Sequence, residues 1–472
     1  MSSSVDGLVS GLSTSSLIGQ LMQVEAAPQN RLKAKVQTAE NTVASYTSVN
    51  GKLFSLKGAA DTLGQLSTWR SIQASSSSSG VVATATGGTN SASGVTTFDV
   101  VSVATAQVGT VQFPKDTADG TDGSTELSFE FGTPPAGTPI KVEIGADKSP
   151  AAIASAINST KGLPVRAGVV TTSTGDVILQ LSSTKSGTDN AFSVTGLSTS
   201  PITVIAPADA MIRVGSLDTT DPMNPTLTPG SYEVKSSSNT FTGLLPGVSV
   251  TITKPETGVT VTAQADVAGI AEKLQALVDA ANAALDEVSA QTAYDPTTRK
   301  GSALTGDFMV RQLSHTIMSS VSGGLSYANP KYVKPADGSG LPEESPGNMK
   351  LNVFGSLAQV GIQLDRGGKL TFNAGKFTTA YNADPTKIQE AMIGLADNFE
   401  EQTSKQSLVV TKVITGRRLE IDNFKSQISN WDIRLAARQL TLQKQYTNLE
   451  TALGNLKNKS NWLAGQLGGM SG

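Results

Sequence analysis

Apolar side chains recur at steps of three or four residues in two stretches near opposite ends of the chain. The first stripe runs from Leu32 to Leu63 and the second from Ile421 to Leu456. Such steps keep side chains on one face of a helix, so each stretch predicts a long amphipathic helix. The predicted seam residues are Leu32, Val36, Val43, Tyr46, Val49, Leu53 and Leu56 in the first helix, and Phe424, Ile428, Trp431, Leu435, Leu442, Tyr446 and Leu449 in the second.

The two stripes are similar in length, and we expect each to be the partner of the other. Closing a loop of about 350 residues costs roughly 5 kcal/mol, because closure entropy grows only with the logarithm of loop length. Burying one Leu, Ile or Phe side chain contributes roughly 1.5–3 kcal/mol before conformational entropy is counted. The pattern therefore predicts an antiparallel helical stalk that carries the rest of the chain as an insertion. A weaker second face of the late helix, formed by Ile433, Ala437, Leu440 and Lys444, predicts a third helix packed there.

Additional helices and a hairpin are predicted beside the stalk. Helical spacing occurs in residues 266–288, 306–321 and 384–392, and Asp266 and Asp384 stand where helix caps are expected. Residues 362–372 alternate apolar and polar side chains about an Asp-Arg-Gly-Gly turn, which is typical of a hairpin.

The middle of the chain, roughly residues 71–265, has the alternation of β-strands. One helix interrupts it, with Ser149 as its cap, Pro150 in its first turn and Gly162 as its stop. We expect two β-rich modules, the second inserted in the first.

The predicted fold class is therefore α+β and multidomain: a long antiparallel stalk of paired N- and C-terminal helices carrying helical, hairpin and inserted β-rich domains. The predicted domains are terminal leg segments (1–30 and 457–472), a helical stalk domain with hairpin (31–70 and 267–456), a β-rich plate domain (71–106 and 206–266), and an outer β-rich domain with one helix (107–205).

Composition narrows the function classes. The 472 residues include 36 basic and 39 acidic side chains, so a formal net charge of −3 gives no reason to expect nucleic acid as a partner. There is no cysteine, which excludes disulfides and thiolate chemistry. We expect no membrane insertion, because no apolar run approaches about 18 residues. The first residues lack a basic segment followed by an apolar core, so no secretory signal peptide is expected. The absence of such a segment is compatible with a cytosolic protein and also with a protein exported by a machine that does not read a signal peptide.

A search for catalytic chemistry finds little. His315 is the only histidine, no G-x-S-x-G elbow accompanies it, and no phosphate-binding glycine loop occurs. The aspartates of residues 116–124 do not have calcium-loop spacing, and side-chain-capped turns are the better interpretation. We expect no enzyme, no catalytic or metal site and no cofactor.

Four stretches, in order, resemble the bacterial flagellar filament-capping proteins, the hook-associated protein 2 family. The opening residues 6–36 contain two Gly-Leu pairs and then the step from Glu25 to Pro28 before a long helix; the others are 244–266, 357–392 and 443–467. Ser13 stands where the family usually has Asp, and residues 107–205 carry the weakest resemblance.

The resemblance implies a cap that leaves the cell unfolded through the flagellar type III export channel and forms a ring at the distal tip. Paired terminal helices would form legs between flagellin subunits, below a plate of β-rich domains under which flagellin folds. The leg residues that would contact the filament and neighbouring subunits, and that we expect to be mobile in the monomer, are Leu12, Leu17, Ile18, Leu21, Trp462, Leu463 and Leu467.

The partners implied by the resemblance are further copies of this chain in a ring homo-oligomer, flagellin, hook–filament junction proteins, the export apparatus and an export chaperone. Two alternatives stay open. Another hook-associated or junction axial protein would share the terminal helices, and a surface adhesin would bind a host surface through its β-rich modules, a role that is compatible with capping. The number of subunits depends on interface angles, which the sequence does not give.

Overall fold

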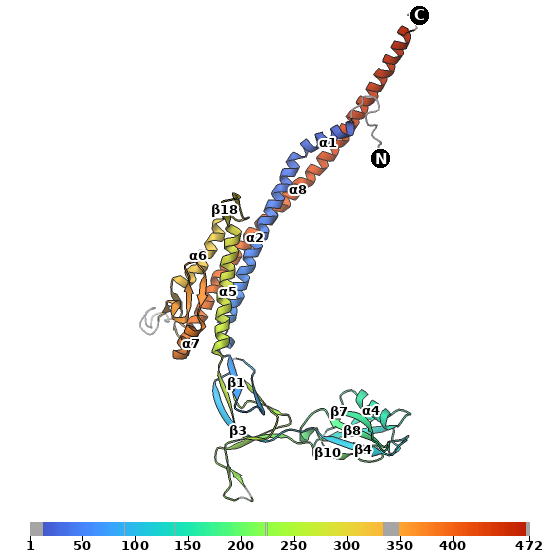
Figure 1. Ribbon diagram of the computed structural model, residues 1–472, viewed down its shortest axis with the longest axis vertical. Coiled ribbons are helices and arrows are strands. Elements are labelled where there is room, and N and C mark those ends of the chain that lie inside the picture. Colours follow the sequence, from blue (N-terminus) through green and yellow to red (C-terminus); the bar gives the residue numbers. More distant parts are fainter. Residues whose placement is uncertain are drawn as a thin grey trace. The chain divides into compact units, whose positions relative to one another are not determined.

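The computed structural model describes residues 13–88, 90–135, 137–221, 223, 225–333 and 349–468. These residues divide into two compact units (Figure 1). The first unit combines Met1–Gln65 with Ala271–Gly472, and the second comprises Leu66–Ile270. No helix in the described part of the chain has both the length and the apolar character that a membrane span requires.

The first unit is built on two long antiparallel helices from opposite ends of the chain. Helices α1 (Thr14–Glu25) and α2 (Ala27–Gly64) run alongside α8 (Pro385–Gly468), as Figure 1 shows. The predicted pairing of N- and C-terminal helices is confirmed. The sequence predicted separate helices at 384–392 and 421–456, whereas α8 is one continuous helix of 84 residues. Asp384 caps its start, because the backbone N–H of Lys387 donates to Asp384 Oδ1 over 3.0 Å.

Shorter elements pack beside the lower part of α2 and α8, and they include the predicted hairpin. Its strands are β22 and β23, and Asp365 closes the turn by accepting the N–H groups of Gly367 and Lys369, each over 2.8 Å. The elements are α5 (Val267–Thr292), α6 (Phe308–Ser322), α7 (Ala374–Ala383), the 3₁₀ helix η2 (Leu357–Val360), and the strand pairs β18 (Tyr294–Asp295) with β19 (Lys300–Gly301), β20 (Leu325–Ala328) with β21 (Leu351–Gly355), and β22 (Ile362–Leu364) with β23 (Leu370–Phe372).

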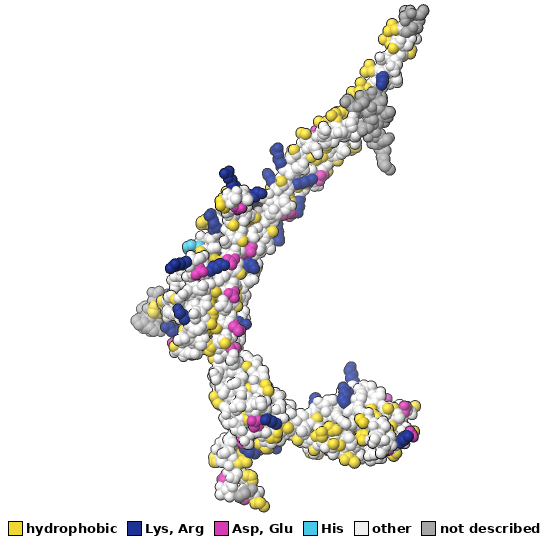
Figure 2. Space-filling model, in the orientation of Figure 1, with side chains coloured by type: hydrophobic (Ala, Val, Ile, Leu, Met, Phe, Trp, Pro, Cys, Tyr) yellow, Lys and Arg dark blue, Asp and Glu magenta, His cyan; other side chains and the backbone are white. Residues whose placement is uncertain are grey.

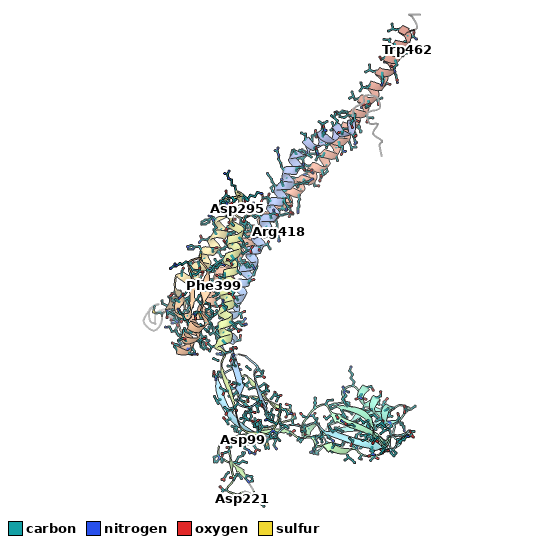
Figure 3. The ribbon with its side chains drawn as sticks, viewed as in Figure 1. Asp99, Asp221, Asp295, Phe399, Arg418 and Trp462 are labelled. Carbon is teal, nitrogen blue, oxygen red and sulfur yellow. The ribbon has the colours of Figure 1, made fainter. Side chains whose placement is uncertain are left out.

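Two side chains tie α5 and α8 into this unit. The Asn282 amide of α5 donates to the backbone oxygen of Leu370 and accepts from its N–H, each over 2.8 Å. Phe399 of α8 is 2 % exposed and lies among the packed helices (Figure 3). This part of the unit therefore has an apolar core that more than two helices enclose.

In the second unit, one group of antiparallel strands forms a five-stranded sheet in the order β1-β17-β3-β11-β14 and a three-stranded sheet in the order β15-β16-β2. Their inner faces share a core that includes Phe98, Ile212 and Val250. The elements are α3 (Leu66–Trp69), β1 (Ile72–Ser76), β2 (Val81–Ala85), β3 (Gly94–Ser102), β11 (Ala210–Val214), β12 (Leu217–Asp218), β13 (Thr226–Leu227), β14 (Tyr232–Ser236), β15 (Thr240–Thr242), β16 (Val248–Ile252) and β17 (Glu256–Ala265).

Residues between β3 and β11 form a second group with its own core, which includes Phe129, Ile153 and Leu179. Its sheets have the orders β10-β4-β8-β7 and β6-β5-β9. The elements are β4 (Val108–Phe113), β5 (Glu126–Phe131), β6 (Ile140–Glu143), α4 (Pro150–Ser159), β7 (Val165–Thr171), β8 (Val177–Ser183), η1 (Thr188–Asn190), β9 (Phe192–Thr195) and β10 (Ile202–Ile205). Two separate cores support the domain boundaries proposed near residues 106 and 206, which stay a prediction.

Candidate assembly interface

The seam between α2 and α8 is the feature that joins the two ends of the chain. Around its middle, Val36, Ala39 and Ile421 form a small buried cluster, with Phe424 and Ile428 packed against it and half-buried. Further down α2, Val49 and Leu53 are 1 % exposed and Leu56 is fully buried, because α5 and α6 add cover there. Most predicted seam residues are therefore buried or half-buried, and burial is greatest in the lower half of α2. Leu32, Trp431, Leu435 and Tyr446 are half-buried, and Leu442 is buried.

Buried amides set the register of this seam. The Gln29 side chain donates to the backbone oxygen of Ile428 over 3.3 Å and to Asp432 Oδ1 over 2.5 Å. Asn50 accepts the Ser407 hydroxyl over 2.7 Å and donates to Thr411 Oγ1 over 3.3 Å. A buried amide left without its partner costs about 1–3 kcal/mol, so a slipped register is disfavoured. Sequence reasoning missed both amides, since each pairs with a residue more than 350 positions away.

Ion pairs cross the same seam along its exposed edges. Lys57 binds Glu400, Lys425 binds Glu40 and Arg438 binds Glu25, each over 2.8 Å. Hydrogen bonds to Glu400 and then Asp61 raise the pKa of Lys57, and the bond to Glu40 raises that of Lys425. Exposed pairs of this kind contribute little to stability, because water screens the two charges. Their order along the two helices agrees with the antiparallel register.

A buried tyrosine joins α6 to α2. Tyr46 is 4 % exposed, and its hydroxyl donates to the carboxylate of Asp307. The other oxygen of Asp307 caps α6 by accepting the N–H of Val310 over 3.0 Å. Burial, followed by the bond to Asp307, raises the pKa of Tyr46 to about 12. One carboxylate thus fixes both the start of α6 and its position against the stalk.

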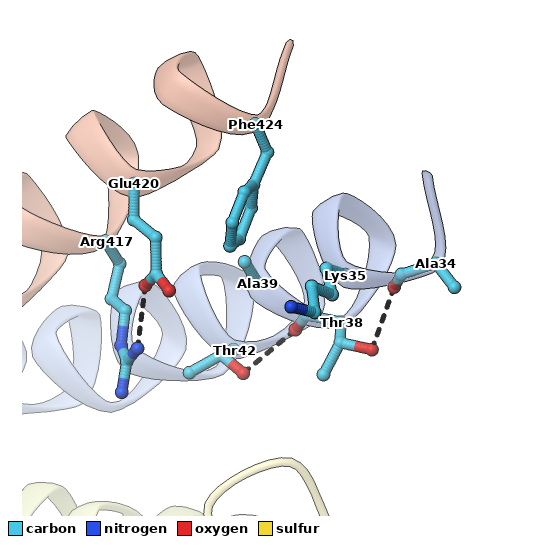
Figure 4. Close-up of a pocket in the computed structure, with 8 residues that line it drawn as sticks. All are labelled: Ala34, Lys35, Thr38, Ala39, Thr42, Arg417, Glu420 and Phe424. Atoms are coloured by element: carbon cyan, nitrogen blue, oxygen red, sulfur yellow. Dashed lines mark hydrogen bonds and ion pairs between the residues drawn. The ribbon is translucent and has the colours of Figure 1, made fainter. Parts of the chain in front are cut away.

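An open groove of about 480 Å³ lies between α2 and α8 just above this point (Figure 4). On α2 it is lined mainly by small side chains, and the hydroxyls of Thr38 and Thr42 turn back to donate to the oxygens of Ala34 and Thr38 over 3.0 and 2.9 Å. On α8, Phe424 forms one wall and the Arg417–Glu420 ion pair of 2.8 Å forms the other. The groove therefore places one aromatic wall opposite an ion pair.

The predicted leg residues fall into two groups. Ile18 is 8 % exposed and faces α8, whereas Leu17 and Leu21 are exposed on α1. Trp462, Leu463 and Leu467 are 55–65 % exposed near the end of α8, where Figures 2 and 3 show hydrophobic side chains and the labelled Trp462. Leu12 lies outside the described residues. Contact of these side chains with a filament, and their mobility in the monomer, stay predictions.

Two sequence-based expectations for α8 are wrong in this chain. Ile433 and Leu440 are 68 and 59 % exposed, so no helix among the described residues covers the predicted second face. The reason is that α5 and α6 end beside the lower part of α8. Leu449, predicted in the seam, is 48 % exposed, because the next residue, Glu450, takes the buried position at this level of α8.

Asp119 and Asp122 close side-chain-capped turns, as the sequence predicted for residues 116–124. Asp119 accepts the N–H of Thr121 over 2.8 Å, and Asp122 accepts that of Ser124 over 3.0 Å. Hydrogen bonds from Thr121 and Ser124 lower the pKa of the respective carboxyl groups. No group of three metal-binding side chains occurs in the described ranges, and His315 is exposed on α6.

Comparison with solved structures agrees with this architecture. The chain is similar to the crystal structure of the D1-D2-D3 domains of the flagellar cap protein FliD from Escherichia coli, with a TM-score of 0.57 and 20 % identity. The match covers 79 % of this chain and 99 % of that one, and at this identity it shows a shared fold.

Sequence comparisons point to one family. The flagellar hook-associated protein 2 of Salmonella typhimurium is 24 % identical over 70 % of this chain and 69 % of its own length. That of Escherichia coli K12 is 22 % identical over 98 % of this chain and 97 % of its own. Family models described as the N-terminus and C-terminus of flagellar hook-associated protein 2 match residues 10–107 and 224–458. The chain therefore belongs to the flagellar hook-associated protein 2 family.

Proposed function

We propose that this chain is a flagellar filament cap, which assembles as a ring at the distal tip and promotes folding and polymerisation of exported flagellin. The observation that carries the proposal is the placement of the two family matches. They include both terminal regions, and those regions pair as α2 and α8. A cap must grip a filament while it holds a cover above the growing end. A helical stalk is suited to contact the filament, and separate β-rich domains are suited to cover its growing end.

The proposed leg is the end of the helix pair. Its side chains Leu17, Leu21, Trp462, Leu463 and Leu467 are exposed apolar groups, and exposed apolar surface favours association over solvation. We assign them contacts with flagellin and with neighbouring copies. The other proposed partners are hook–filament junction proteins, the flagellar export apparatus and an export chaperone.

We also infer export without a cleaved signal peptide. Passage through a narrow channel requires an unfolded chain, and a sequence without cysteine cannot be trapped by disulfides on the way.

Complementation tests the proposal directly. A flagellated bacterium that lacks its own cap gene should regain motility and filaments when it expresses this chain together with its cognate flagellin. Without the chain, flagellin should appear unpolymerised in the medium. Failure to restore filaments, although the protein is exported and folded, would count against a capping role.

Matched variants locate the function in the leg. Changing Trp462 and Leu463 to Ser should abolish motility without altering the helical signal of the purified protein. The control changes Ile202 and Val204 of β10 to Ser, since they are 73 and 62 % exposed but lie outside the proposed leg. Equal loss of motility in both variants would argue against the leg assignment.

A further inference from the structure

Two unpartnered apolar stripes occur on the helix pair formed by α1, the start of α2, and α8. The α1 stripe consists of Leu17, Leu21, Val24 and Pro28, at steps of four, three and four residues, and every member is exposed. The α8 stripe consists of Ile433, Ala437 and Leu440, also all exposed. Each has the spacing by which one helix packs on another, yet among the described residues neither is covered.

The two stripes stand at the same height on the helix pair. Glu25 of α1 binds Arg438 of α8 over 2.8 Å, which places these two residues level. Both helices rise by about 1.5 Å per residue in opposite directions, so Leu440 lies between the levels of Leu21 and Val24. Ala437 likewise lies between Val24 and Pro28. The side chains of one stripe therefore match the gaps of the other.

The stripes point to different sides, so they cannot meet within one copy. Ile433 lies two residues before Leu435, and Leu440 lies two residues before Leu442. Leu435 and Leu442 face the seam, and two residues correspond to about 200° around a helix. Ile433 and Leu440 therefore lie on the side of α8 that is turned away from the seam. The α1 stripe lies about 60–120° around its helix from the buried Ile18. One copy thus presents a different stripe on each of two sides at one height.

We propose that the α1 stripe of one copy packs against the α8 stripe of the next copy. This inference rests on the proposed capping function, and it names the contact by which neighbouring legs join. A contact between two different surfaces repeats from copy to copy, and it gives a closed ring when the rotation closes and there is no offset along the axis. The equal height of the stripes supplies that condition.

Charge favours this pairing over a contact between two α8 stripes. From Thr14 to Asn30 the only charged residue is Glu25, which is engaged with Arg438. Around the α8 stripe lie Arg434, Lys444 and Asp432, and Asp432 accepts a hydrogen bond from Gln29 of its own copy, so two facing α8 stripes would bring four cations and two carboxylates into one interface. The uncharged α1 stripe brings none. Since each face offers only three or four side chains, a single contact is weak, and ring closure strengthens it by giving every copy two.

Cysteine cross-linking tests the contact, because the chain has no cysteine of its own. Full-length chains with Val24→Cys are mixed with full-length chains with Leu440→Cys and are oxidised mildly without flagellin. The two kinds of chain are made distinguishable by size, so that the product between them can be recognised. The expected product is a disulfide between the two kinds of chain. The control replaces Leu440→Cys by Leu419→Cys, which is 66 % exposed on the same helix but about 30 Å lower. With the Leu419→Cys chains, the disulfide-linked product between the two kinds of chain should not form.

Three results would overturn the proposal. Equal cross-linking at Leu419 and Leu440 would mean that contact is unspecific. Cross-linking of Leu440→Cys chains with each other, but not with Val24→Cys chains, would mean that two α8 stripes meet. A cross-link that forms only to added flagellin would make flagellin the occupant. Motility in the complemented strain is scored separately, so a motile strain with no cross-link refutes this contact alone, and a cross-link without motility refutes the capping role alone.

Discussion

Tyr46→Phe is the most informative single change in the stalk unit. It removes one hydroxyl and keeps the ring that fills the space between α2 and α6. In the native protein that hydroxyl donates to Asp307, whose second oxygen caps α6 at Val310. The variant leaves the cap in place and removes only the link between α6 and α2, so its effect measures that link.

The structure gives the expected magnitude and its dependence on pH. A hydrogen bond to a charged group contributes about 1.5–3 kcal/mol to the free energy of unfolding. The pKa of Tyr46 is raised from 10.0 to about 12. The folded state therefore holds the phenolic proton more tightly than the unfolded state does. The stabilisation is complete below about pH 10 and is lost as the pH rises toward 12, by roughly 2–3 kcal/mol in all.

The measurement is urea unfolding followed by far-UV circular dichroism, which reports mainly the helices of the first unit. At neutral pH the variant should unfold at a lower urea concentration than the native protein. Between about pH 10 and pH 12 the gap should close, since only the native chain has Tyr46 to ionise. Tyr294→Phe is the matched control, because Tyr294 is 57 % exposed, and it should behave as the native protein at every pH.

Two outcomes would refute this reasoning. If Tyr46→Phe leaves the neutral-pH midpoint unchanged, the hydroxyl does not anchor α6. If the gap between the two proteins stays constant up to pH 12, the pKa of Tyr46 is not raised by its surroundings and the link has another physical origin.

Three other changes should follow from burial, charge and backbone shape. Leu56→Ala empties a fully buried site between α2 and α8 and should lower the unfolding free energy by about 2–5 kcal/mol in the same assay. Glu25→Gln breaks an exposed pair with Arg438 and should cost less than about 1 kcal/mol, a difference that disappears in high salt. Gly361→Ala should cost more than about 1 kcal/mol, measured by thermal unfolding, because Gly361 has φ of 80° and a Cβ there would lie 2.5 Å from the backbone oxygen of Asn373. An unchanged midpoint for Leu56→Ala or Gly361→Ala, or a salt-independent loss for Glu25→Gln, would contradict the respective prediction.

Local signals in the sequence predicted the elements well. The spacing from Leu32 to Leu63 marked α2, and Asp384 marked the start of α8, where it accepts the N–H of Lys387. The Asp-Arg-Gly-Gly turn marked the β22–β23 hairpin. Each of these depends on residues that are close in sequence, so the physical cause is readable from the chain itself.

Strand partners depended on the tertiary structure. Residues 248–265 lie in the region predicted to be β-rich, and they form the two strands β16 and β17. However, β16 pairs with β2 and β15, whereas β17 pairs with β1 and β3. Alternation assigns each side chain to one face of a sheet but does not select the neighbouring strand. The reason is that loops of very different lengths have similar closure entropies, so several strand partners are nearly equal in cost.

What the sequence determined by itself is the set of amphipathic surfaces: two long stripes, their likeness in length, and a second face on the late helix. Which surfaces are covered was decided only by the tertiary structure. The stripe from Val49 to Leu56 is buried, since α5 and α6 lie there, and Ile433 and Leu440 stay exposed, since those helices do not extend so far. Periodicity is a property of one helix, whereas burial depends on the lengths and positions of all its neighbours, and these come together only when distant parts of the chain have packed.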